Sequence, residues 1–310
     1  MLLRILSVAM NTYREAVRAR ILHGLLALAV GTLGYSLVVG AYALQNQNRV
    51  VSDLGAASIS AYAIIVSIVL GATSLHRELE LKTIFPILAR PIRRWEYLVG
   101  KFMGTVLTLG VFVGLNTGLL LFALGSLTRR SLPLTFLLPS LIVAAVGLLA
   151  WRVPRLRTAA PIPLAVVLLV SGAYWGRDGV SERSVILGQA LLTMFEVSIV
   201  TALTLVFAAF SSPFLTAVFS FSIFIVGRSA DTLARLPARV FGQGIKTLGK
   251  VLSHVFPNLM IYVPPRVLLT GEAAGVSFWP YASLGAFQAL CWCVGLLSLA
   301  AVVFRRRDFL

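Results

Sequence analysis

Charged residues are scarce in this sequence of 310 residues, in which Asp, Glu, Lys and Arg together make up only 12%. A soluble domain keeps roughly a quarter of its residues charged. The shortage argues against a soluble enzyme, a disordered chain and a nucleic-acid-binding domain. Acidic residues are the scarcer kind, 11 against 27 Lys and Arg, and the basic residues lie at the ends of long apolar runs. That distribution is typical of a protein that crosses a membrane many times.

Cysteine is nearly absent, and the two that occur, Cys291 and Cys293, lie inside the last apolar run. On a helix, residues two positions apart point about 200° from each other, so these two cannot pair. No disulfide scaffold is expected. We also find no His, Asp or Glu cluster at metal or acid–base spacing. The sequence therefore predicts no catalytic residue and no metal site, and a membrane-embedded enzyme is disfavoured.

A nucleotide site is not expected in this chain either. The nearest match to a phosphate-binding loop is residues 244–250, and Val251 follows where Ser or Thr would ligate Mg²⁺. No predicted strand precedes this segment.

Eight apolar runs are long enough, or nearly long enough, to cross a bilayer, which needs about 20 residues per helix. They are residues 21–44, 54–75, 98–127, 132–151, 162–176, 185–210, 214–227 and 278–304. Residues 1–20 have amphipathic helical spacing, which predicts an interfacial helix. We expect an all-α polytopic protein with six core spans and an inserted helix pair in residues 129–184, eight spans in total. If the short fifth run does not cross, six spans remain.

Basic residues predict the orientation. With a cytoplasmic N-terminus, most Lys and Arg residues of the short loops fall on the inside, as the positive-inside rule requires. Both termini are then cytoplasmic, and residues 228–277 form a long external segment with interfacial helices. This segment covers the exit, contacts a periplasmic partner or serves as a structural cover. The absence of targeting signals favours a bacterial inner membrane.

Residues 76–97, between the second and third runs, are the most informative segment. They expose charges of both signs beside apolar residues, a surface that can dock a soluble partner by complementarity. The alternative is a solvated loop whose arginines fix the topology. The segment contains the patterns R-E-x-E-x-x-T and A-R-P-I-x-R-x-E-Y-L-x-G-K.

These patterns resemble the first cytoplasmic loop of ABC exporter permeases of the type-2 class. The chain end from Phe304 and the order of the helices are similar to that family as well. The resemblance implies a membrane subunit without a fused ATPase, whose loop couples to separate ATPase subunits that bind ATP and Mg²⁺. It implies a second permease chain, in a homodimer or a heterodimer. The implied coupling residues are Arg77, Glu78, Glu80, Thr83, Arg90, Pro91 and Arg94, with Glu78 and Arg94 as the docking contacts.

Two of the polar residues within the apolar runs are candidate functional residues. Glu196 is the one acidic residue deep in a run, and a carboxylate at that depth costs about 2.5 kcal/mol or more. It either belongs to the translocation path or a proton-linked site, or it bonds to Ser, Thr or Arg on a neighbouring helix. We expect Asn116 to make an interhelical hydrogen bond.

Glycines at four-residue spacing, Gly110, Gly114 and Gly118, give the third run a smooth stripe for close helix packing. The stripe fits either a seam between two permease chains or packing within one chain.

The sequence thus predicts the transmembrane subunit of an ATP-driven exporter, with no covalent chemistry of its own. The alternative is an ATP-independent secondary transporter or channel that uses Glu196 for ion coupling. The substrate is not indicated by any motif.

Overall fold

The long apolar runs form helices, and five of these are long and apolar enough to cross a membrane among the residues described. The structure, a computed structural model, describes residues 1–18, 21–43, 46–80, 93–129, 131, 133–153, 158–235, 238–272, 275 and 277–305. Within these ranges every regular element is a helix. The predicted all-α, polytopic membrane architecture is confirmed at this level.

The helices and their bounds, in chain order, are α1 (Leu2–Arg18), α2 (Ile21–Tyr42), α3 (Gln47–Glu80), α5 (Arg94–Thr128), α6 (Leu134–Arg152), α7 (Pro161–Trp175), η2 (Gly176–Asp178), α8 (Val180–Ala208), α9 (Pro213–Arg228), α10 (Ala230–Ala234), α11 (Ala238–Val255), η3 (Met260–Tyr262), α12 (Arg266–Thr270) and α13 (Phe278–Arg305). Both α3 and α5 continue beyond their apolar runs into residues 76–97. The backbone hydrogen bonds of an α-helix form within the helix itself, so a helix can continue past the end of its apolar run.

The centre of the bundle is the pair α3 and α8, which run parallel. The hydroxyl of Ser52 donates to Glu182, and further along both helices the hydroxyls of Ser67 and Thr201 lie 3.0 Å apart. Because residue numbers rise together in α3 and α8 from one contact to the next, the two helices run in the same direction. Together with α5 and α13, these helices bury the main apolar core. We call the end of the bundle where α3 ends and α5 begins the junction end, and the opposite one the far end.

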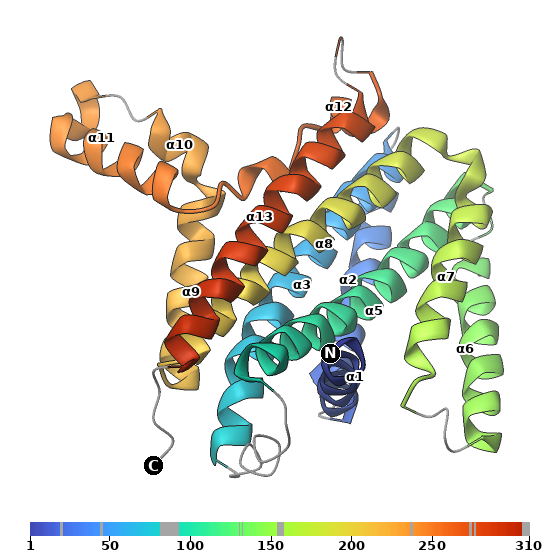
Figure 1. The fold of residues 1–310 in the computed structure, drawn as a ribbon. Coiled ribbons are helices and arrows are strands. Elements are labelled where there is room, and N and C mark those ends of the chain that lie inside the picture. The colour runs from blue at the N-terminus through green and yellow to red at the C-terminus, as the bar shows by residue number, and fades with distance from the viewer. Residues whose placement is uncertain are drawn as a thin grey trace.

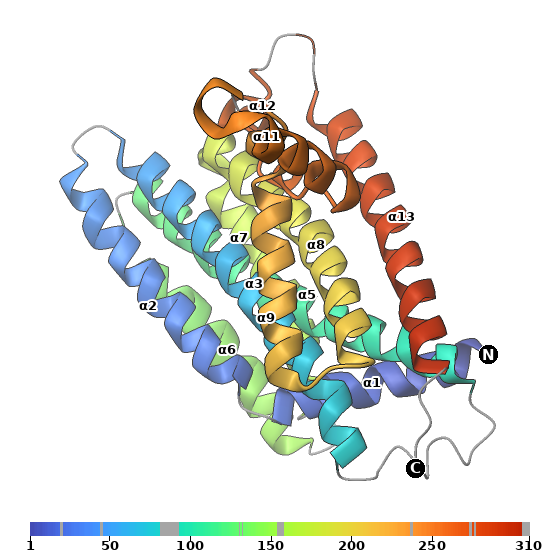
Figure 2. The same cartoon turned by 90° about the vertical axis from the view of Figure 1, so that its left-hand side faces the viewer.

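Helix α1 lies across the junction end (Figure 2). Its small and aromatic residues Ala9, Thr12, Tyr13 and Ala16 are buried, whereas most of its arginines face outward. This one-sided burial follows from the amphipathic spacing of the sequence.

Helices α6 and α7 form a pair at one side of the bundle (Figure 1). Helix α7 packs along α5, whereas α6 is mostly exposed. The chain leaves α5 and returns to α8 at the same place. There the guanidinium of Arg129 lies 3.0 Å from the carboxylate of Asp178 and 4.1 Å from the ring centre of Trp175.

The segment between α9 and α13 is at the far end, where α10 and α11 project away from the bundle (Figure 1). Residues 257–259 fold back onto the end of α9. The N–H of Leu259 donates to the carbonyl of Gly227 at 3.0 Å. A Cβ on Gly227 would lie 2.7 Å from the carbonyl oxygen of Pro257, so this contact requires glycine.

Candidate functional site

Lys101 on α5 is fully buried at the junction end. Its ammonium donates to the carbonyl oxygen of Ser74 on α3 at 3.0 Å and to the hydroxyl of the same residue at 3.3 Å. It also lies 4.0 Å from the carboxylate of Glu15 on α1. A buried ammonium is costly unless its N–H groups and its charge are matched. Glu15, Ser74 and Lys101, which we call the Lys101 junction, therefore tie three helices together.

Helix α1 is seated directly on two glycines of α5. A Cβ on Gly100 would lie 2.6 Å from Val8 Cβ, and one on Gly104 would lie 2.4 Å from the carbonyl oxygen of Ala9. Real Cβ atoms do not approach other atoms so closely. The glycines next to Lys101 thus allow the backbones of α1 and α5 to touch, which brings Glu15 within reach of Lys101.

The start of α5 is also attached to the end of α13. The guanidinium of Arg94 donates to the carbonyl oxygens of Phe304 at 3.3 Å and Arg305 at 2.9 Å. The ring of Tyr97 stacks on that of Phe304, with centroids 6.2 Å apart. A cation at the C-terminal end of a helix satisfies carbonyls that have no partner within the helix and matches the helix dipole. Arg94 therefore binds α13 of its own chain.

The other predicted coupling residues lie between these two attachments. Arg77, Glu78 and Glu80 are in the last turns of α3, but their side chains are outside the described part of the structure. Thr83, Arg90 and Pro91 lie outside the described residues altogether. The structure thus describes the two helix ends that flank the segment 81–92. Of the two predicted docking contacts, Glu78 and Arg94, it describes the side chain of Arg94.

Glu196 is fully buried in α8 and forms an ion pair with Arg228 at the end of α9. The hydroxyl of Ser60, on α3, lies beside the same carboxylate. Neither this hydroxyl nor Glu196 Oε2 has a hydrogen-bond partner of normal geometry in the described part of the chain. The sequence analysis offered two roles for Glu196: a translocation or proton-linked site, or a carboxylate bonded to a residue on a neighbouring helix. Arg228 on α9 is a partner of the kind that the second role requires.

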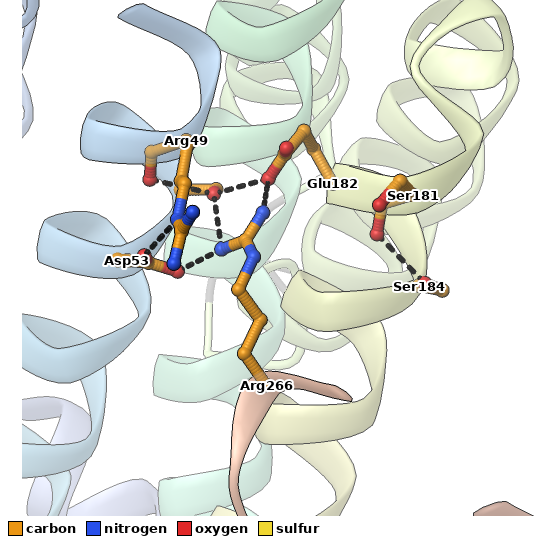
Figure 3. A network of polar contacts seen from close by, with 7 residues as sticks. Arg49, Asp53, Ser181, Glu182, Ser184 and Arg266 are labelled. Atoms are coloured by element: carbon orange, nitrogen blue, oxygen red, sulfur yellow. Dashed lines mark hydrogen bonds and ion pairs between the residues drawn. The ribbon is translucent and has the colours of Figure 1, made fainter. Parts of the chain in front are cut away.

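A second ionic group lies at the far end, about 21 Å along α8 from Glu196. Arg266, at the start of α12, reaches between α3 and α8 near the beginnings of both helices (Figure 3). Its guanidinium pairs with both Asp53 and Glu182, and Arg49 lies 3.8 Å from Asp53. We call Arg49, Asp53, Glu182 and Arg266 the Arg266 cluster. It fastens the segment before α13 to the helix pair at the centre of the bundle.

A cavity of about 410 Å³ extends between these two ionic groups. Its walls are mainly apolar and come from α3, α8, α9 and the segment 263–269. Ser60 and Arg228 line it toward Glu196, and Arg49, Asp53 and Arg266 line it toward the far end. Ligand sites are commonly cavities of this size, with apolar walls and a few polar groups.

Asn116 and the glycine stripe serve packing within the chain. The amide of Asn116 donates to the carbonyl of Phe112 in its own helix at 2.8 Å, whereas the sequence analysis expected a hydrogen bond to another helix. A Cβ on Gly118 would lie 2.7 Å from the carbonyl carbon of Leu168 in α7, and one on Gly114 would lie 3.5 Å from the Cβ of Ala165. Next to Gly110 the nearest atom is Cε of Met194, at 3.5 Å. Helix α7 of the same chain therefore covers two of the three glycines.

The sequence analysis missed two features, the burial of Lys101 and the Arg266 cluster. It considered Ser, Thr or Arg on a neighbouring helix as the partner of Glu196 but did not identify Arg228. A usable signal was present for the cluster, because Asp53 and Glu182 are acidic residues that lie just before the apolar runs 54–75 and 185–210. Among the described residues, no group of His, Cys, Asp and Glu is arranged to hold a metal ion. Comparison of the sequence with protein-family models and with curated proteins gives no match.

Proposed function

We propose that this chain is the membrane subunit of an ATP-driven exporter of the type-2 ABC class, located in a bacterial inner membrane. In this proposal the chain does no covalent chemistry, and separate ATPase subunits bind ATP and Mg²⁺. A second permease chain, identical or different, completes the path through the lipid bilayer. The proposal combines the resemblance of residues 74–104 with the geometry of the helix ends around them.

The observation that carries the proposal is the double attachment of the segment 81–92. On one side, the Lys101 junction joins the end of α3 to α1 and α5. On the other side, Arg94 joins the start of α5 to the end of α13. A displacement of this segment by a docked ATPase would therefore move four helices together. Rigid elements joined by packed contacts are what transmits motion between distant sites.

In the proposed topology the junction end is cytoplasmic and α2, α3, α5, α6, α7, α8, α9 and α13 all cross. Arg4, Arg14, Arg94, Arg152 and Arg305 lie at the junction end, in agreement with the positive-inside rule. Helices α7 and α9 are short for a 30 Å hydrocarbon layer, at about 22 and 24 Å by helical rise. A bilayer thins locally around short spans at modest cost.

The contacts of Arg94 refine its proposed role. Because its guanidinium binds the end of α13, we assign it to positioning the loop, and Glu78 keeps the role of docking contact. The cavity between α3, α8 and α9 is the proposed part of the translocation path, and α10 and α11 are the proposed contact for a periplasmic partner.

The test is purification of the tagged full chain from its native membrane in mild detergent. We expect a nucleotide-binding ATPase to co-purify and Glu78→Ala to reduce its recovery. Glu272→Ala is the matched control, because Glu272 is an exposed glutamate at the far end, and it should leave recovery unchanged. If the chain purifies without an ATPase, the exporter proposal is wrong, and ion-coupled transport through Glu196 becomes the function to test.

A further inference from the structure

Helices α10 and α11, which we call the arm, follow the end of α9, and the chain then returns to the place where the arm began. On its return, the N–H of Leu259 donates to the carbonyl of Gly227, the last but one residue of α9, at 3.0 Å. The amide of Asn258 also donates to the carboxylate of Asp231 in α10 at 2.8 Å. These two bonds close the base of the arm. Helix α11 is therefore held through its base and stands apart from the central helices (Figure 1).

The direction of α11 differs from that of the spans. It lies crosswise to α9 in the two views, Figure 1 and Figure 2. In the proposed topology α9 crosses the bilayer, so α11 runs along the membrane surface. Helix α9 is about 24 Å long, which is shorter than a hydrocarbon layer of about 30 Å. So short a span brings the helix that follows it to the level of the outer headgroups.

The described side chains of α11 include an exposed apolar edge. Val251 and Val255, one helical turn apart, are 53% and 58% exposed. Gln243, about 120° around the helix from Val255, is exposed as well. In a span, exposed apolar side chains face lipid. Because α11 is not a span, its valines would face water unless its apolar side lies in the interface.

The charges of α11 are all of one sign. Within residues 238–255 the charged residues are Arg239, Lys246 and Lys250, and none is acidic. Their positions fall within about 40° of one another on the helix and at least about 140° from Val255. A helix with one apolar side and one basic side binds a membrane surface through its buried apolar area and through attraction to anionic headgroups.

We propose that α11 lies in the outer interface of the membrane, with the side of Val251 and Val255 among the acyl chains and its basic residues at anionic phospholipid headgroups. This inference deepens the proposed function, on whose topology it rests, by naming the partner of the apolar side. It restricts the proposed periplasmic partner to the polar side of α11.

The experiment places a bimane fluorophore at single cysteines of the full chain in nanodiscs. The free cysteines, Cys291 and Cys293, are first replaced by Ala. Val255→Cys labels the apolar side, and Gln243→Cys on the same helix is the matched control. Quenching by a phosphatidylcholine with a doxyl group near its headgroup is compared with quenching by iodide in water. We expect the ratio of lipid to iodide quenching to be about threefold or more higher at position 255 than at position 243.

Three results would contradict the membrane assignment, provided that the labelled chains unfold at the temperature of the unlabelled one. Equal ratios at positions 243 and 255 would mean that α11 has no preferred side. Iodide quenching at position 255 without lipid quenching would mean that the apolar side faces water and is left for a protein. Protection from both quenchers would mean that a second copy of the chain covers it.

A second comparison tests the basic residues. An equal mixture of phosphatidylcholine and phosphatidylglycerol should raise the ratio at position 255 about twofold over phosphatidylcholine alone. Lys246→Gln with Lys250→Gln should remove this increase. Arg177→Gln with Arg183→Gln takes the same charge from the far end outside α11 and should preserve it. An increase that is absent, or that survives the loss of both lysines, would show that the headgroup contact is wrong.

These measurements need no ATPase. If lipid does not quench the probe at position 255 and an ATPase still co-purifies, the interfacial assignment is wrong and the exporter proposal remains. If lipid quenches the probe as expected and no ATPase is found, α11 binds the membrane in a transporter of another class.

Discussion

The ammonium of Lys101 on α5 donates to the backbone carbonyl of Ser74 on α3, 3.0 Å away, although 27 residues separate the two along the chain. The bond joins α3 and α5, the helices on either side of the segment 81–92, and holds them at a fixed separation. It also places a buried positive charge against α1.

Replacing Lys101 by Met keeps the length of the side chain and removes the charge and its N–H groups. We expect the free energy of unfolding to fall by about 1.5–3 kcal/mol, because hydrogen bonds from a charged donor contribute that much. Glu15→Gln, which alters the half-exposed partner at 4.0 Å, should cost less than about 1 kcal/mol. Thermal unfolding of both variants in detergent checks this. Equal losses would mean that the ion pair with Glu15, rather than the bond to Ser74, holds the junction.

The glycine stripe of α5 should respond unequally to added methyl groups. Gly118→Ala would place a Cβ against the backbone of Leu168, which cannot move aside, so we expect a loss of about 1–3 kcal/mol from overpacking. Gly110→Ala meets only the flexible end of Met194 at 3.5 Å and should be neutral or stabilising. The two variants are compared by thermal unfolding. The reverse order would indicate that α7 does not pack on α5 as described.

The Arg266 cluster should behave as a coupled unit. Arg266→Gln leaves Asp53 and Glu182 as neighbouring carboxylates, so it should destabilise the chain more than Glu182→Gln does. The double variant should recover part of that loss, with a coupling energy of about 1–2 kcal/mol. A double-mutant cycle of unfolding free energies measures it. Simple additivity of the two single losses would show that Arg266 is not bound to Glu182 in the membrane.

The junction end should be sensitive to alkali through Tyr13 on α1. Burial raises the pKa of Tyr13 from its ordinary value of 10.0 to about 12. Between these values the folded chain keeps a proton that the unfolded chain has lost, so stability falls as the pH rises from 10 toward 12. Tyr13→Phe should reduce this loss. At neutral pH it should cost little, since the hydroxyl has no partner among the described residues.

Tyr262 provides the matched comparison for Tyr13. Its hydroxyl donates to the carbonyl of Gly285 at 3.0 Å, so Tyr262→Phe should cost about 1 kcal/mol at neutral pH. Thermal unfolding of both Phe variants between pH 7 and pH 11 is the measurement. If Tyr13→Phe destabilises the chain as much as Tyr262→Phe at neutral pH, the Tyr13 hydroxyl is bonded and its assigned environment is wrong.

Local features of the sequence predicted most of the helices, because apolar length and amphipathic spacing are properties of neighbouring residues. The runs 98–127 and 185–210 became α5 and α8 with modest extensions. The glycine stripe likewise predicted close helix approach. It did not indicate the partner, because α7 lies about fifty residues further along the chain and its position depends on the whole bundle.

The contacts of the candidate site could not be predicted in the same way. Lys101 was part of a recognised motif, but its burial depends on α1 folding back across α5. Arg266 meets Asp53 and Glu182 only because α3 and α8 run side by side. Each of these residues alone is an ordinary charge near the end of an apolar run. Charge pairing over such distances in the sequence is decided by the fold rather than by local pattern.

The contact between Arg129 and Asp178 brings together the two ends of the segment that contains α6 and α7. Arg129 precedes α6 and Asp178 follows α7, so both ends of this helix pair are attached to the bundle at the same place. Two antiparallel helices reverse the chain twice, and α8 would keep its direction without them. Removal of the pair would therefore leave the direction of α8 unchanged. A shortened chain with a brief linker between Arg129 and Asp178 would expose Gly114 and Gly118 to lipid, a smooth groove ready for another helix.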